Sequence, residues 1–150
     1  MKITTQAERL ESLKAGTVAA LSLSFAFLST TSVNHLLLST NFMALTNMQA
    51  KPLNWQWVVS GAIAAFCGLL FGVTYRYAIR SDDNPHLKTG VVLAFGLVRG
   101  LTQLEIGAIA RGSILPFAVM AAESILWFAI AAIALNWAIG RGWVKPFNSN

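Results

Sequence analysis

The chain has 150 residues, of which 55% are hydrophobic and 11% are charged, and its formal net charge is +5. Because soluble domains carry about 25% charged residues, this composition excludes an ordinary soluble domain and predicts a single membrane domain over residues 1–150. The basic residues flank apolar segments and form no single patch, so they favour membrane lipids with anionic headgroups over nucleic acid as partners.

Apolar segments divide the chain into spans. A transmembrane helix needs about 20 apolar residues, and the segments that satisfy this cover about 15–38, 57–79, 88–110 and 115–139. We therefore predict an all-α membrane protein with four transmembrane helices. Thr5 and Glu8 have capping-box spacing in the polar lead-in, and the helix that they start is expected to run on into the first span. Pro116 favours a tight hairpin between the last two spans.

The distribution of basic residues predicts the orientation of the spans. Of the eleven Lys and Arg residues, eight lie on the side of the two termini, two on the opposite side and one, Arg99, within the third span. By the positive-inside rule, both termini are expected to be cytoplasmic, or stromal in a photosynthetic membrane. This bias also argues against an antiparallel dimer of two copies.

Three charged residues lie inside apolar segments: Arg99, Glu105 and Glu123. A charge at the centre of a membrane helix costs about 2.5–3.5 kcal/mol. Because pairing with an opposite charge offsets part of this cost, we expect the three residues to form a buried charge cluster. Arg99 and Glu105 lie about 120° apart on one helix, and Glu123 is the expected ionic partner of Arg99. Glu105 then needs protonation, Thr102, another helix or water. The cluster could be an interhelical clamp, a proton or ion relay, or a docking point for another membrane protein.

Pairs of glycines indicate close helix packing. Gly68 and Gly72 in the second span, and Gly96 and Gly100 in the third, have the G-x-x-x-G spacing that lets helix backbones approach each other. Each pair is expected to face another helix, either of this chain or of a partner.

No motif for an enzyme or a metal site is found, so we predict a non-enzymatic protein without a metal or other cofactor. The alternative concerns His35, near the end of the first span, whose imidazole could bind a pigment such as chlorophyll through its magnesium. A hydrogen-bonded residue at the membrane interface is the other interpretation of His35.

The loop between the second and third spans is highly charged. Asp82, Asp83 and Asn84 are expected to act as turn and capping residues before Pro85. The loop either neutralises its own charges or forms an interaction surface for a partner subunit or a lipid headgroup. Its candidate interaction residues are Arg76, Arg80, Asp82, Asp83 and Asn84.

The stretch YRYAIRSDDNPHLKTGVVLAFGLVRGLTQLE, residues 75–105, resembles a family of small integral membrane proteins of cyanobacteria and chloroplasts. The resemblance implies a thylakoid or plasma membrane location and a role near photosynthetic complexes. It groups into one unit Tyr75, Arg76, Tyr77, Arg80, Asn84, Pro85, Arg99 and Glu105. The expected function is an accessory, assembly or small structural subunit of a membrane complex that contains other integral membrane proteins. The alternative is a proton- or ion-coupled transporter that uses Glu105, Glu123 and Arg99.

Overall fold

The computed structural model describes residues 2–33, 55–79, 84–109 and 114–147. Within these ranges the chain forms α1 (Lys2–Val33), α3 (Trp55–Ala78), α4 (Pro85–Ile109) and α5 (Leu115–Gly140), and it has no strand. All four helices are long and apolar enough to cross a membrane. The predicted all-α membrane architecture is therefore confirmed.

The backbone of a membrane span adopts a helix because hydrocarbon offers no other partner for its N–H and C=O groups. As the sequence predicts, α1 runs unbroken from the polar lead-in into the apolar segment. It begins at Lys2, so Thr5 lies inside the helix and is not its N-cap, which corrects the predicted capping box. The first span was expected to reach residue 38, and residues 34–38 lie outside the described ranges.

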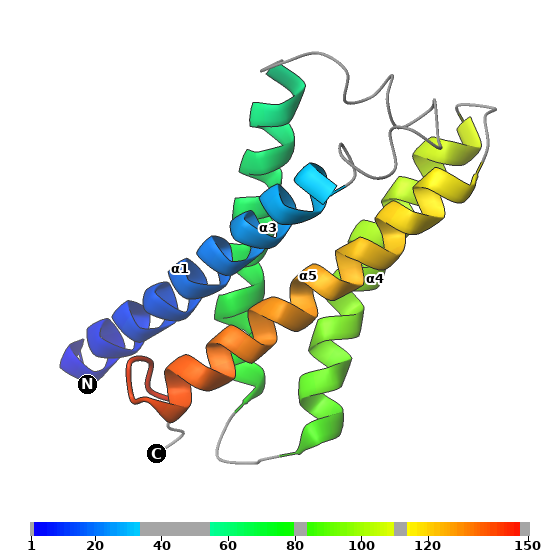
Figure 1. Ribbon diagram of the computed structural model, residues 1–150. Helices are drawn as coiled ribbons and strands as arrows, with labels where there is room; N and C mark the ends of the chain where they lie inside the picture. Colours follow the sequence, from blue (N-terminus) through cyan, green and yellow to red (C-terminus); the bar gives the residue numbers. More distant parts are fainter. Residues whose placement is uncertain (1, 34–54, 80–83, 110–113, 148–150) are drawn as a thin grey trace.

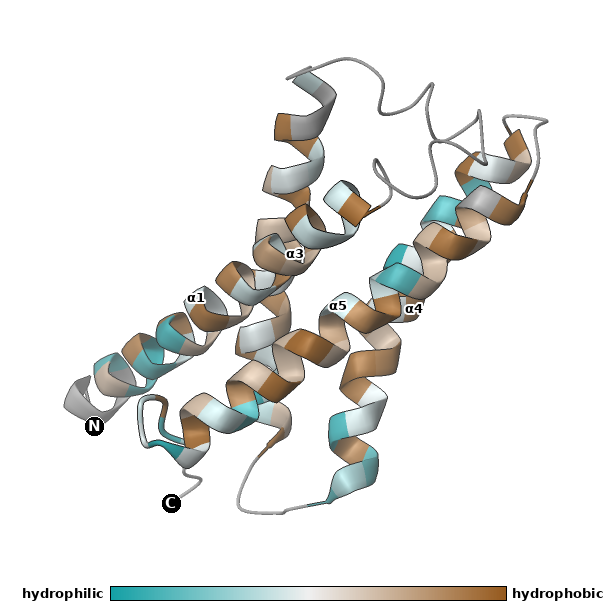
Figure 2. Cartoon of the chain, in the orientation of Figure 1, coloured by the Kyte–Doolittle hydropathy of each residue, from teal (hydrophilic) through white to brown (hydrophobic). Residues whose placement is uncertain are grey.

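The helices form two antiparallel pairs, α1 with α3 and α4 with α5, and α1 also packs along α5 (Figure 1). The two termini lie at the same end of the bundle, which we call the terminal end; the opposite end is the far end. Towards the far end, α3 diverges from α4 and α5 (Figure 1). Apolar residues cover most of the helices, but hydrophilic residues interrupt the far half of the α4–α5 pair (Figure 2).

Glycines set the spacing within the α1–α3 pair. A Cβ atom on Gly68 would lie 2.7 Å from the Cα of Ala20, and one on Gly72 would overlap the carbonyl of Ala15. Because the backbones already touch at these two positions, any side chain larger than hydrogen would push α1 and α3 apart.

The α4–α5 pair is built in the same way. A Cβ atom on Gly96 would lie 2.9 Å from the Cα of Ile125, and one on Gly100 would lie 3.0 Å from the carbonyl oxygen of Ala121. All four predicted packing glycines thus face a helix of this same chain. Of the two alternatives that the sequence left open, a helix of this chain or a helix of a partner, the structure shows the first.

Aromatic side chains join the two pairs in the terminal half of the bundle. Phe71 and Tyr75 on α3 are buried, and the Phe71 ring lies 5.5 Å from Phe95 on α4 and 5.2 Å from Phe128 on α5. The Tyr75 hydroxyl also donates a hydrogen bond of 3.2 Å to Asn136 on α5. These contacts fix α3 against α4 and α5 at this level.

Candidate functional site

A left-handed glycine turns the chain back at the end of α5. Gly142 has φ of 75°, and the N–H of Trp143 donates to the carbonyl of Ala138 over 2.9 Å. This is the Schellman ending, in which a glycine takes the conformation that other residues avoid. The turn directs Val144 into the core, where it is 1% exposed, and brings Lys145 against α1.

Arg76 on α3 is the most polar of the fully buried side chains, with 0% of its surface exposed. Its Nη2 donates to the Glu8 carboxylate over 2.5 Å, its Nη1 to the Ser12 hydroxyl over 2.7 Å, and its Nε to the Lys145 carbonyl over 2.8 Å. Nη1 also donates to the Glu8 carbonyl over 3.2 Å. We call Glu8, Ser12, Arg76 and Lys145 the terminal clamp, since they join α1, α3 and the C-terminal segment.

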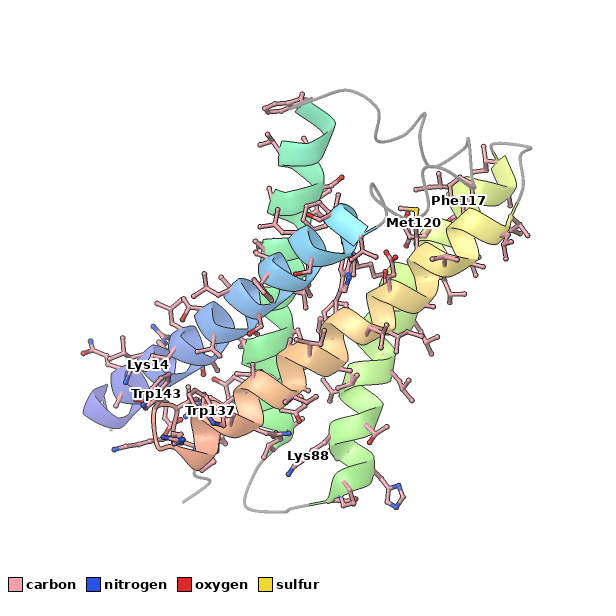
Figure 3. The ribbon with its side chains drawn as sticks, in the orientation of Figure 1. Lys14, Lys88, Phe117, Met120, Trp137 and Trp143 are labelled. Atoms are coloured by element: carbon pink, nitrogen blue, oxygen red, sulfur yellow. The ribbon has the colours of Figure 1, made fainter. Side chains whose placement is uncertain are left out.

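The clamp corrects the assignment of Arg76 to an exposed interaction loop. Its guanidinium is buried because the polar lead-in of α1, which carries Glu8, extends beyond the apolar span and reaches the end of α3. Glu11, one turn after Glu8, accepts a further hydrogen bond of 2.9 Å from the Lys145 N–H and pairs with Lys14 over 2.7 Å. Lys14, Trp137 and Trp143 all lie at this end of the molecule (Figure 3).

Of the other predicted loop residues, Asn84 lies within the described ranges. Its side-chain oxygen accepts a hydrogen bond of 3.0 Å from the His86 N–H, and Pro85 is the first residue of α4. Asn84 is therefore the N-cap of α4, which confirms its predicted capping role. Arg80, Asp82, Asp83 and the candidate pigment ligand His35 lie outside the described residues.

A second polar site lies deeper in the bundle, at Arg99. This residue is ten positions before Ile109, the last residue of α4, and so about 15 Å from the far end of the helix. Its Cζ lies 4.9 Å from the ring centre of Trp127 on α5. Trp127 is 6% exposed and meets Phe27 of α1 edge-on, with ring centres 5.6 Å apart. The stack therefore links α4, α5 and α1.

The stack of Arg99 on Trp127 contains two buried donors that lack an acceptor among the described residues. Arg99 Nε and Trp127 Nε1 are both inaccessible, and neither donates a hydrogen bond within the described part of the chain. A cation over an indole gains about 2 kcal/mol when it is desolvated, whereas a charge at this depth costs about 2.5–3.5 kcal/mol. The contact with Trp127 thus offsets only part of the cost of Arg99.

The ion pair predicted between Arg99 and Glu123 is not found among the described side chains. Between described side chains, the ion pairs are Lys14–Glu11 and Arg76–Glu8, and none joins Arg99 to Glu123. Glu123, one turn before Trp127, has an interaction of its own. The guanidinium instead lies over the indole because the close approach of α4 and α5 at Gly96 and Gly100 brings Trp127 within its reach.

Glu105 is not part of this site. It is exposed, lies about 180° around α4 from Gly96, and is four residues before the end of the helix, about 6 Å from it. The expected cluster of three buried charges is corrected accordingly. Thr102, one candidate partner of Glu105, donates its hydroxyl to the Val98 carbonyl over 2.9 Å instead.

Sequence reasoning missed two features: the hydrogen bonding of Arg76 to α1 and the contribution of Trp127. Glu8 in the lead-in and Arg76 at the end of α3 carry opposite charges close to the same end of their spans, a signal that could have suggested the first. No sequence signal separates Trp127 from the other tryptophans of the chain. Among the described residues, no three His, Cys, Asp or Glu side chains gather as metal ligands would.

Comparison with known proteins returned no match: no family model, no curated protein and no solved structure is similar to this chain.

Proposed function

We propose that this chain is a non-enzymatic accessory, assembly or small structural subunit of a larger membrane complex. The observation that carries the proposal is the guanidinium of Arg99, a charge near the middle of a helix long and apolar enough to cross a membrane, which forms no ion pair with a described residue. Retaining such a charge costs stability. An interaction with another membrane protein gives a reason to retain it.

The remainder of the molecule supports this role. The glycine contacts and the terminal clamp hold the helices in a fixed arrangement, as a structural subunit requires. We further propose that the terminal end faces the cytoplasm or stroma, in keeping with its basic residues. A location in the thylakoid or plasma membrane of a cyanobacterium-like cell, and a photosynthetic partner complex, rest on the resemblance of residues 75–105.

One observation favours a second candidate, a proton- or ion-coupled transporter. Arg99 and Glu123 lie at nearly the same depth, about 15 and 12 Å from the far ends of their helices. A carboxylate within a membrane span can bind and release a cation or proton. In this case Glu123→Gln would abolish ion-dependent flux into vesicles while the protein stays folded, whereas the subunit hypothesis expects no flux in wild type.

The test of the subunit hypothesis is affinity purification from the native membrane in a mild detergent, followed by native electrophoresis and mass spectrometry of the co-migrating proteins. We expect stoichiometric integral membrane partners with wild type and with Arg9→Gln, a control at an exposed position of α1. A chain that migrates only as a monomer or as a dimer of itself would refute the hypothesis and make flux assays the next step.

A further inference from the structure

We propose that Arg99 is the docking point for a transmembrane helix of a partner membrane protein, which presents an Asp or Glu side chain at the middle of the membrane. This inference rests on the proposed function and specifies the chemistry of the partner at that site.

The chemistry of the partner follows from what Arg99 lacks. Its guanidinium has five N–H donors, and the buried one, on Nε, donates no hydrogen bond to a described residue. Trp127 lies over one face of the group and supplies no acceptor, and its own N–H is a second buried donor without an acceptor in the described part of the chain. A carboxylate satisfies both the charge and the donors, with up to two parallel hydrogen bonds to the guanidinium.

The position of the partner follows from the surface around Arg99. Nε is the buried nitrogen of this side chain, whereas the residue as a whole is partly exposed, so the end of the guanidinium can be reached from outside the bundle. One turn towards the terminal end, Phe95 is covered by Phe71 of α3. One and two turns towards the far end, Gln103 is partly exposed and Ile106 is 46% exposed.

We call Arg99, Gln103 and Ile106 the Arg99 stripe. The stripe lies in the half of α4 that leads to the far end, and α3 diverges from α4 in that direction (Figure 1). A partner helix that runs along the stripe would place its acidic residue at the level of Arg99 and apolar residues at the level of Ile106.

Depth argues against a lipid as the source of the acceptor. Lipid phosphates and carbonyls stay near the interface, whereas Arg99 lies about 15 Å along α4 from its far end. A helix can hold a carboxylate at that depth because its backbone is anchored on both sides of the membrane.

A second copy of this chain is also a poor source of the acceptor. In a dimer whose copies share one orientation, Arg99 would face Arg99, and Glu105 would lie about 9 Å nearer the far end. Glu123 is closer in depth, but it already has an interaction within its own chain. The charges therefore favour a different protein.

The test uses leucine-rich transmembrane peptides of about 20 residues that carry a single Glu at the centre, a single Glu near one end, or no Glu. Each labelled peptide is mixed with the labelled full chain in phospholipid vesicles, and association is measured by energy transfer. We expect the central-Glu peptide to bind wild type about tenfold more tightly than the all-leucine peptide.

Variants of the full chain distinguish the contribution of the Arg99 guanidinium to peptide binding from that of the surrounding surface. Arg99→Gln should reduce binding of the central-Glu peptide to that of the all-leucine peptide, Arg99→Lys should retain part of it, and Arg9→Gln should have no effect. Equal binding of the central-Glu and all-leucine peptides to wild type would overturn the inference. So would equal binding of the two Glu peptides, because the site would then not select for depth.

The two hypotheses can fail separately. Stoichiometric partners in the native purification, combined with peptide binding that ignores Arg99, would leave the subunit role standing and refute this docking point. Peptide binding that depends on Arg99, without any native partner, would retain the chemistry of the site and refute the subunit role.

Discussion

Nη2 of Arg76 lies 2.5 Å from the carboxylate of Glu8, a residue 68 positions earlier in the chain. The contact joins the end of α3 to the polar lead-in of α1. Because Arg76 is fully buried while Glu8 is one-third exposed, the pair depends on the arginine being held in place by several acceptors at once.

Replacing Arg76 with Met should therefore destabilise the isolated chain. The variant leaves Glu8, Ser12 and the Lys145 carbonyl without their donor, and breaking a buried charge pair in this way costs about 3 kcal/mol. The measurement is unfolding by denaturing detergent in mixed micelles, with Arg9→Met as a control on the exposed surface of α1. A loss no larger than that of Arg9→Met would show that the clamp contributes nothing to stability.

Gly72→Ala should also destabilise the chain, by about 1–3 kcal/mol, because the new methyl group overlaps the Ala15 carbonyl and forces α1 from α3. Gly90→Ala on α4 is the matched control, since a Cβ there meets no atom within 4 Å. Alanine is the better helix former, so Gly90→Ala should unfold at the same detergent fraction as wild type or a higher one. Equal behaviour of the two variants would contradict the close approach of α1 and α3.

Arg99→Leu should have the opposite effect to Arg76→Met. The charge at mid-depth costs about 2.5–3.5 kcal/mol and regains about 2 kcal/mol from the indole, so its removal should stabilise the isolated chain by about 1 kcal/mol. The same variant should lose its partner in the native purification. A substantial loss of stability in the purified chain would mean that Arg99 is already satisfied within it, and would remove the reason for a partner.

The orientation can be tested with single cysteines placed at Lys2, Lys51 and Asn150 in a chain that carries Cys67→Ala. In intact cells or right-side-out vesicles, a membrane-impermeant maleimide should label the cysteine at position 51 and spare those at positions 2 and 150. All three should react after the membrane is permeabilised. Labelling of position 2 or 150 in intact membranes would reverse the predicted topology.

Much of the architecture can be read from local sequence. The lengths of the apolar runs determine the spans, Asn84 and Pro85 carry the signal for the start of α4, and the spacing of Gly68 with Gly72 and of Gly96 with Gly100 indicates close packing. These features depend on residues within a few turns of one another. The partners of the charged residues were predicted less accurately, because a charge pair depends on which helices are in contact and on how far along each helix the charged residues lie.

The sequence alone therefore determined that this is an all-α membrane protein with four apolar segments of spanning length, small-residue faces and charges inside its spans, since hydropathy and helix periodicity are properties of each segment. Only the tertiary structure decided that Arg76 binds the lead-in of α1, that Glu105 lies apart from Arg99, and that Arg99 rests on Trp127 without an acceptor among the described residues. The physical reason is geometric: a shift of one turn moves a side chain about 5 Å along a helix, which is enough to exchange one partner for another.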